Sequence, residues 1–388
     1  LQLKQPFLDY KIWKHPIIIA VSAYLMWLVL TSITSTDPLV SFKFLLSKLW
    51  FIIPVLIFGT YFFRNHENRV RFLWFFIVSC SIVVCFTMGH HSMYGFGEEE
   101  GHWVMWPFFK DHTIYGAIIA LCLPLSVALL GQKGRPALSK AILILINAVL
   151  ILGLVFSYTR AAWLSVLCAV IIGCFVYFKV NFKLLISIAL LALSTVYFQW
   201  DNIQMVLAKN THEHTTEAFD EKLQSAANVT TDASNLERIN RWDCAIQMFT
   251  KKPLLGFGPG TYAFEYAAFQ DPENLTIIST NFGDMGNAHS EYLGALSETG
   301  LIGMLLFLGI VAAIFYSSIT LYYKYDENND VKILIMGIIV SLASYFIHAF
   351  LNNYLDTDKA AVPVWAMCAM VVTMSISLQA NDQATKKD

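Results

Sequence analysis

The chain has 388 residues, of which 56% are hydrophobic and 14% are charged, and its formal net charge is -2. A soluble domain carries roughly 25% charged residues. This composition, with a mean hydropathy of +0.55, excludes an ordinary soluble domain and predicts an integral membrane protein. The small net charge gives no indication of a nucleic-acid partner, and we expect none. Seven cysteines, most of them in apolar segments, are typical of small core residues rather than of a disulfide framework.

Apolar segments long enough to cross a bilayer recur along the chain, since about 20 apolar residues span the hydrocarbon core. The predicted fold class is therefore all-α, a polytopic membrane bundle of about ten transmembrane helices. The segments lie near residues 16–34, 44–63, 70–88, 114–131, 139–157, 161–178, 183–199, 299–323, 332–350 and 361–379.

These segments divide the chain into three parts. Residues 1–199 form an N-terminal bundle of about seven spans, residues 200–298 form a long loop with a helical subdomain, and residues 299–388 hold three spans and a tail. Loops of this length are usually functional or disordered. The chain begins with Leu1 rather than methionine, so we expect an N-terminal piece to be missing.

Basic residues cluster at alternate ends of the predicted spans. One set of ends carries Lys4, Lys11, Lys14, Arg64, Arg69, Arg71, Lys133, Arg135, Lys140, Lys179, Lys183, Lys324, Lys332, Lys386 and Lys387, and the other set carries Lys43, Lys48, Lys110, Arg160 and Lys359. Because positive residues stay in the cytoplasm, both termini are predicted to be cytoplasmic. The long loop and residues 89–113 are then predicted to lie outside.

Arg160 lies alone in the apolar stretch 141–178. A charge at the bilayer centre costs about 2.5–3.5 kcal/mol. The stretch is long enough for two spans, so we place Arg160 at the outer rim between them, where it can face water. The alternative is an arginine that only extends its side chain to the membrane surface.

A helix is predicted within the long loop. Apolar residues at 239, 242, 245, 246 and 249 have helical spacing, and Ser234 with Glu237 fits a capping box at its start. Pro253 and the glycine-rich residues 256–260 end it. We expect an amphipathic helix packed on the outer mouth of the bundle.

Arg238 and Arg241 lie three residues apart on this helix, so they share one face. One guanidinium group can donate to two phosphate oxygens at once. A diphosphate bound between Arg238 and Arg241 would also relieve the repulsion between the two arginines. The alternative is two surface arginines paired with Glu237, Asp243 or lipid head groups.

His289 directly precedes the apolar run of the eighth predicted span. An unperturbed histidine has a pKa of about 6.5 and can act as a base, although a lone histidine at an interface is more often structural. Glu291, Asp111 and His112 are candidates for supporting roles near the outer rim. The histidines and glutamates of residues 89–113 match no standard zinc spacing, so no metal or other cofactor is expected.

Several of these residues resemble a known family. Arg160 and Leu164 resemble the RxxxL element of the bacterial O-antigen ligase and polymerase superfamily. His289-Ser290, nine further residues, and then Gly300 and Gly303 resemble the ligase element, with Met304 where ligases often have threonine. The helix with Arg238, the Pro-Leu break and the glycine-rich turn also resemble this family, and the similar region runs over about 157–308.

The resemblance implies a GT-C-like membrane glycosyltransferase whose donor is a glycan on undecaprenyl diphosphate. It implies lipid A–core, a second lipid-linked repeat or a protein hydroxyl as acceptor, and a multi-pass protein of the bacterial inner membrane whose site faces the periplasm. Arg160, Arg238 and Arg241 would then hold the diphosphate, and His289 would be the base of an inverting transfer. The ligase element favours an O-antigen ligase; the alternatives are a repeat-unit polymerase of the same superfamily and a transporter or lipid flippase.

Overall fold

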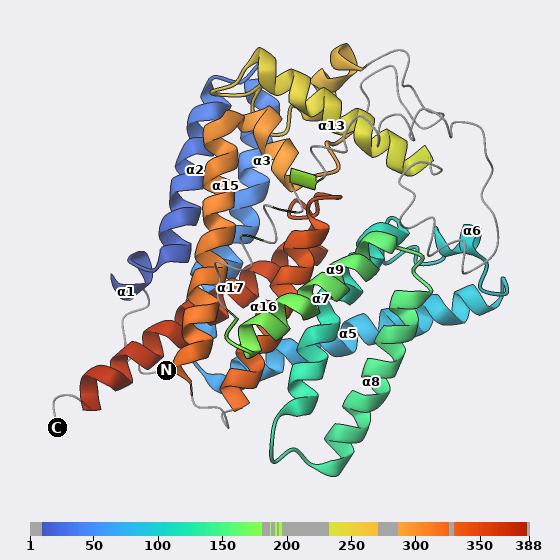
Figure 1. The fold of residues 1–388 in the computed structure, drawn as a ribbon, viewed down its shortest axis with the longest axis vertical. Helices are drawn as coiled ribbons and strands as arrows, with labels where there is room; N and C mark the ends of the chain where they lie inside the picture. Colours follow the sequence, from blue (N-terminus) through green and yellow to red (C-terminus); the bar gives the residue numbers. More distant parts are fainter. Residues whose placement is uncertain are drawn as a thin grey trace.

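The computed structural model describes residues 10–180, 233–270, 286–325 and 330–385, with Ser187, Leu191, Ser194 and Thr195 between them. Within these residues the chain is helical and contains no strand (Figure 1), which confirms the all-α prediction. The elements are α1 (Tyr10–Trp13), α2 (Pro16–Ile33), α3 (Pro38–Phe51), the π-helix η1 (Ile52–Ile57), α4 (Gly59–Phe62), α5 (His66–Ser92), α6 (Glu98–Gly101), α7 (His112–Gly131), α8 (Ala137–Val155), α9 (Arg160–Tyr177), α13 (Ala233–Lys251), α14 (Tyr262–Glu265), the 3-10 helix η2 (Tyr266–Phe269), α15 (Glu291–Lys324), α16 (Asp330–His348) and α17 (Asp358–Thr385).

Nine helical segments in the described part of the chain are long and apolar enough to cross a membrane. The elements α3, η1 and α4 together make one of them, Pro38–Phe62. The nine coincide with nine of the predicted spans. The remaining predicted span, 183–199, lies outside the described residues apart from four isolated positions.

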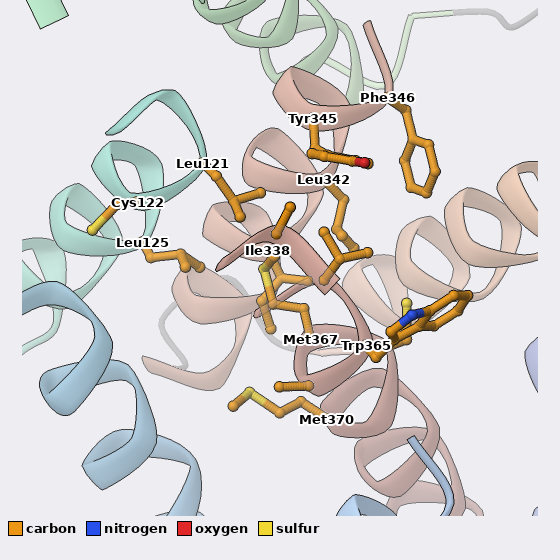
Figure 2. Close-up of a cluster of buried hydrophobic side chains, with 14 of the residues drawn as sticks. Leu121, Cys122, Leu125, Ile338, Leu342, Tyr345, Phe346, Trp365, Met367 and Met370 are labelled. Carbon is orange, nitrogen blue, oxygen red and sulfur yellow. The ribbon is translucent and has the colours of Figure 1, made fainter. Parts of the chain in front are cut away.

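The centre of the bundle is made by α7, α16 and α17, the most deeply buried of these segments. Figure 2 shows Leu121 of α7, Leu342 of α16 and Met367 of α17 converging on one another. Small residues bring the backbones together, because a Cβ on Gly337 would lie 2.4 Å from the Ala128 Cβ. Close backbone contact is the usual basis of helix packing in membranes.

The two ends of the bundle differ. Helix α13 lies across one end, over α2, α3 and α15, whereas the α7–α8 turn, the end of α15 and the start of α16 lie at the opposite end (Figure 1). Lys133, Arg135, Lys324 and Lys332 belong to that opposite end. This arrangement agrees with the predicted alternation of basic residues. Lys48 departs from it, because it lies buried inside the span Pro38–Phe62 rather than at its end.

Helix α15 is broken at Gly300, whose φ of 70° and ψ of -174° are not helical. The turn that follows α13 docks into this break: the Leu301 amide donates to the Pro253 carbonyl at 2.9 Å, and the Gly258 amide donates to the Glu298 carbonyl at 2.8 Å. A Cβ on Gly300 would lie 2.2 Å from the Leu254 oxygen. The predicted span 299–323 is therefore interrupted near its start, at Gly300.

Helix α13 confirms the predicted loop helix but corrects two of its details. The helix already includes Ala233, so Ser234 lies within it and is not its N-cap. Glu237 pairs with Arg241 instead of closing a capping box. The buried face runs through Arg241, Cys244, Ala245 and Met248, whereas the predicted apolar position Ile246 is exposed.

Candidate functional site

Arg160 is the first residue of α9 and is half-buried, so it lies at a helix end, as expected, and not in the middle of a span. The preceding turn is held from several sides. The Thr159 hydroxyl donates to the His112 carbonyl at 2.8 Å, and the Tyr158 hydroxyl donates to the Phe96 carbonyl at 2.7 Å. The start of α9 is therefore fixed against α7 and the 89–113 segment, and Arg160 with it.

Arg241 of α13 is almost completely buried, and its contacts define its orientation. Its Nε donates to Glu237 at 2.7 Å, and its guanidinium stacks on the Tyr266 ring, 4.3 Å from the ring centroid. Its Nη1 is buried without a hydrogen bond and points at Gly286, where a Cβ would lie only 1.7 Å away. Glycine at 286 thus leaves space for the guanidinium beside the segment that carries His289.

Arg238 lies one turn earlier on α13 and is half-buried. Its Nε is buried. The two arginines therefore differ: Arg241 is held by Glu237 and Tyr266, whereas Arg238 is the more accessible of the pair.

His289 lies between this face and the start of α15. Its φ is +46°, an uncommon value for a residue other than glycine, and its amide donates to the Asn287 side chain at 2.9 Å. Burial and, after it, the nearby charges of Arg238 and Arg241 lower the pKa of His289 to about 4, against the opposing effects of Glu237 and a hydrogen bond with Asn352. The structure thus brings His289, Arg238 and Arg241 together, and the histidine is neutral at pH 7.

Two residues that the sequence analysis missed complete this group. The Asn352 side chain forms a hydrogen bond with the His289 side chain. Its Nδ2 also lies 3.0 Å from Nε2 of His348. His348 is buried at the end of α16, against Ala161 and within range of the Arg238 charge. This chain of side chains connects His289 to the start of α9, and so to Arg160. A second histidine at a span end, four residues before an asparagine, was the signal available in the sequence.

The three expected supporting residues have other partners. Asp111 caps α7 by accepting from the Thr113 and Ile114 amides at 2.9 and 3.1 Å. His112 stacks on His102 with ring centroids 4.2 Å apart.

Glu291 fixes the loop that carries Asn352. Its Oε1 accepts from the Leu355 amide at 2.8 Å and from the Tyr345 hydroxyl at 3.1 Å, and its own amide donates to the Ala349 carbonyl at 2.9 Å. The carboxylate therefore holds residues 349–355 on the start of α15.

A cavity of about 170 Å³ borders the 286–290 segment. Residues of α2, α3, α15, the glycine-rich turn and the 353–356 loop line it, among them Tyr24, Lys48, Tyr262, Glu291, Glu298 and Asp356. Lys48 forms a salt bridge with Asp356. Among the described residues, no group of three or more His, Cys, Asp or Glu side chains is placed to hold a metal ion.

The fold and the arginine–histidine group define a polytopic helical membrane protein whose charged site lies at one end of the bundle. Residues 143–308 match the family model described as O-antigen ligase. This segment contains Arg160, Arg238, Arg241 and His289, and the match confirms the resemblance to the O-antigen ligase and polymerase superfamily. The comparison with curated proteins gave no match.

Proposed function

We propose that this protein is a membrane glycosyltransferase that moves a glycan from undecaprenyl diphosphate to an acceptor hydroxyl. In its most specific form the proposal is an O-antigen ligase of the bacterial inner membrane that attaches O-antigen to lipid A–core on the periplasmic side. The observation that carries it is a neutral histidine held beside two arginines within the region that matches the O-antigen ligase family.

The arginines suit the leaving group. When the glycosidic bond breaks, the electron pair stays on the diphosphate oxygen, so negative charge grows there. Arg238, with Arg160 at the start of α9, would stabilise that charge, and donors fixed in advance at such a position contribute roughly 2.7–4 kcal/mol each. Arg241 would attract the diphosphate through its charge without a direct contact, because Glu237 and Tyr266 already hold its guanidinium.

The histidine suits the acceptor. A base must be unprotonated to take the hydroxyl proton, and the lowered pKa of His289 keeps it so at neutral pH. Binding of an anionic diphosphate beside Arg238 and Arg241 would offset their charges and raise the pKa of His289, which would strengthen the base when the donor is present. Attack from the face opposite to the diphosphate inverts the anomeric carbon.

The glycan profile of a strain that lacks this protein tests the proposal in a cell. We expect the ladder bands on lipid A–core to disappear while lipid-linked polymer accumulates, and the chain supplied in trans should restore the ladder. A profile reduced to a single repeat would instead indicate the repeat-unit polymerase of the same superfamily. An unchanged profile, with normal lipid-linked glycan, would contradict the proposal.

A further inference from the structure

The cavity beside the 286–290 segment is separate from the face of α13 that carries Arg238 and Arg241 (the arginine face). Gly286, Asn287, Ala288 and Ser290 line it, and these residues flank His289. Arg238 and Arg241 do not line it. The short segment that carries the candidate base therefore has an arginine-rich side and a cavity side.

The ionisable side chains of the cavity are mainly carboxyl groups, whereas those of the arginine face are guanidinium groups. Of the described residues that line it, Lys48 is the one cation, and it is already paired with Asp356. Glu291 and Glu298 add two further carboxyl groups. A phosphate or carboxylate that entered would lose its hydration without gaining a cation in exchange, and such uncompensated burial of charge is costly.

The remaining lining suits hydroxyl groups. Both hydrogen bonds of Glu291 go to Oε1, so its Oε2 retains acceptor capacity. Asn287 and Asn353 supply amide donors and acceptors, and Tyr24 and Phe44 supply ring surface. A cavity of about 170 Å³ with carboxyl, amide and aromatic groups offers what one sugar ring requires, namely partners for its hydroxyls and an apolar surface for its C–H face.

We propose that this cavity binds the acceptor sugar, and that it selects a sugar that is uncharged or carries an amino group over one that carries phosphate or carboxylate. The proposal rests on the glycosyltransferase function proposed above. The donor diphosphate then occupies the arginine face and the acceptor ring occupies the cavity. The 286–290 segment, which carries His289, borders both, because Gly286 lines the cavity and lies against the Arg241 guanidinium. The cavity disfavours the diphosphate, because its cation is already paired with Asp356.

Position 263 gives direct access to the cavity, because Ala263 lines it and is half-buried. Ala268, in the next turn of the same segment, is exposed and does not line it, which makes it a matched control. The variants Ala263→Cys and Ala268→Cys are treated, in the full-length protein, with methanethiosulfonate reagents of similar size that carry an ammonium, a hydroxyl or a sulfonate group. Mass spectrometry of the peptide gives the labelling rate at each position.

At each position we compare the labelling rate of the ammonium reagent with that of the sulfonate reagent. We expect this ratio of rates to be about tenfold higher at Ala263→Cys than at the control Ala268→Cys. The hydroxyl reagent should be intermediate. Equal ratios at the two positions, or a lower ratio at Ala263→Cys, would overturn the proposed charge selection. This arm measures the cavity alone and does not depend on whether the protein transfers glycan.

The second arm measures transfer. The hydroxyl-bearing adduct on Ala263→Cys fills the cavity, so it should raise the KM for acceptor by about tenfold or more relative to the unlabelled variant, with unchanged binding of the lipid-linked donor. The same adduct on Ala268→Cys should change neither quantity. An unchanged acceptor KM after labelling at 263 would overturn the acceptor site but leave the proposed function standing. A wild-type protein that neither binds donor nor transfers glycan would instead refute the proposed function.

Discussion

His289 is held as a neutral side chain by burial and by the charges of Arg238 and Arg241, which lower its pKa to about 4. Protonation removes the base, so activity should be lost as the pH falls through this value. The pH dependence of kcat/KM for the donor reports the ionisation of the free enzyme. We expect kcat/KM to stay constant from pH 7 to about pH 5 and to fall at lower pH. An inflection near 6.5, the value of an unperturbed histidine, would contradict this account.

The enzyme with bound donor provides a second test of the His289 assignment. Because the diphosphate offsets the arginine charges, the inflection in kcat should lie at higher pH than the inflection in kcat/KM. The variant Arg238→Gln removes one of the charges that lower the pKa, and should move the inflection of kcat/KM upward.

Asn352 is predicted to position His289. Its side chain bonds the imidazole, which fixes the ring and determines which nitrogen carries the proton. Asn352→Ala should lower kcat by about tenfold to a hundredfold with little change in donor binding, by analogy with residues that orient a histidine. Asn352→Asp keeps a hydrogen-bond acceptor and adds a negative charge, so it should restore part of kcat and move the acid inflection to higher pH.

The control for both variants is Asn68→Ala, which removes an exposed amide that caps the Phe62 carbonyl at the far end of the bundle. Its kcat and pH profile should equal those of the wild type. Loss of donor binding in Asn352→Ala, in parallel with kcat, would show that Asn352 supports the fold rather than the base.

At the scale of elements, the junction of α13 with α15 depends on glycine at 300. The backbone there has φ and ψ values that almost only glycine adopts. A Cβ at this position would lie 2.2 Å from the Leu254 carbonyl oxygen. Gly300→Ala should therefore lower the free energy of unfolding by about 1–3 kcal/mol and reduce transfer, because α13 and its arginines would move relative to His289.

Thermal unfolding in detergent, together with a transfer assay, measures both effects. Gly309→Ala lies in the same helix with open space around the Cβ position, and should leave transfer unchanged and stability equal or slightly higher. Equal stability of Gly300→Ala and Gly309→Ala would show that the docked turn is not held by this break.

The elements also show what sequence patterns can and cannot predict. The spans were predictable because about 20 apolar residues in a row have few alternatives to a membrane helix. The existence of α13 followed from helical spacing, but its buried face did not. Its buried charges, Glu237 and Arg241, pair with each other, and Arg241 stacks on Tyr266, a contact outside the helix that no local pattern encodes.

The candidate site was predictable to a similar extent. Arg160 stood out because a charge within a long apolar stretch is uncommon. Arg238 and His289 stood out through helical spacing and through the resemblance to the ligase element. Lys48, His348 and Asn352 did not, because each acquires its role from a partner on another element. A lysine inside a span gives no sign in the sequence that Asp356 will reach it.

At the scale of the whole molecule, the α7–α8 turn lies at one end of the bundle and α13 lies across the other (Figure 1). The turn carries Lys133 and Arg135, and α13 carries Arg238 and Arg241. By the positive-inside rule, α13 and His289 are expected to face outward, as the proposed function requires. The site needs no metal in this account, because arginines compensate the charge of the leaving group.

The central claim is that this group of residues transfers a glycan from a lipid diphosphate. The most direct measurement uses purified protein, a lipid diphosphate-linked glycan and lipid A–core in excess chelator, with donor binding and transfer assayed separately. We expect transfer by the wild type, loss of transfer with retained donor binding in His289→Ala, and loss of both in Arg160→Ala with little rescue in Arg160→Lys, since lysine lacks the paired donors of a guanidinium. Transfer by His289→Ala at the wild-type rate, or wild-type transfer that requires added divalent metal, would contradict it.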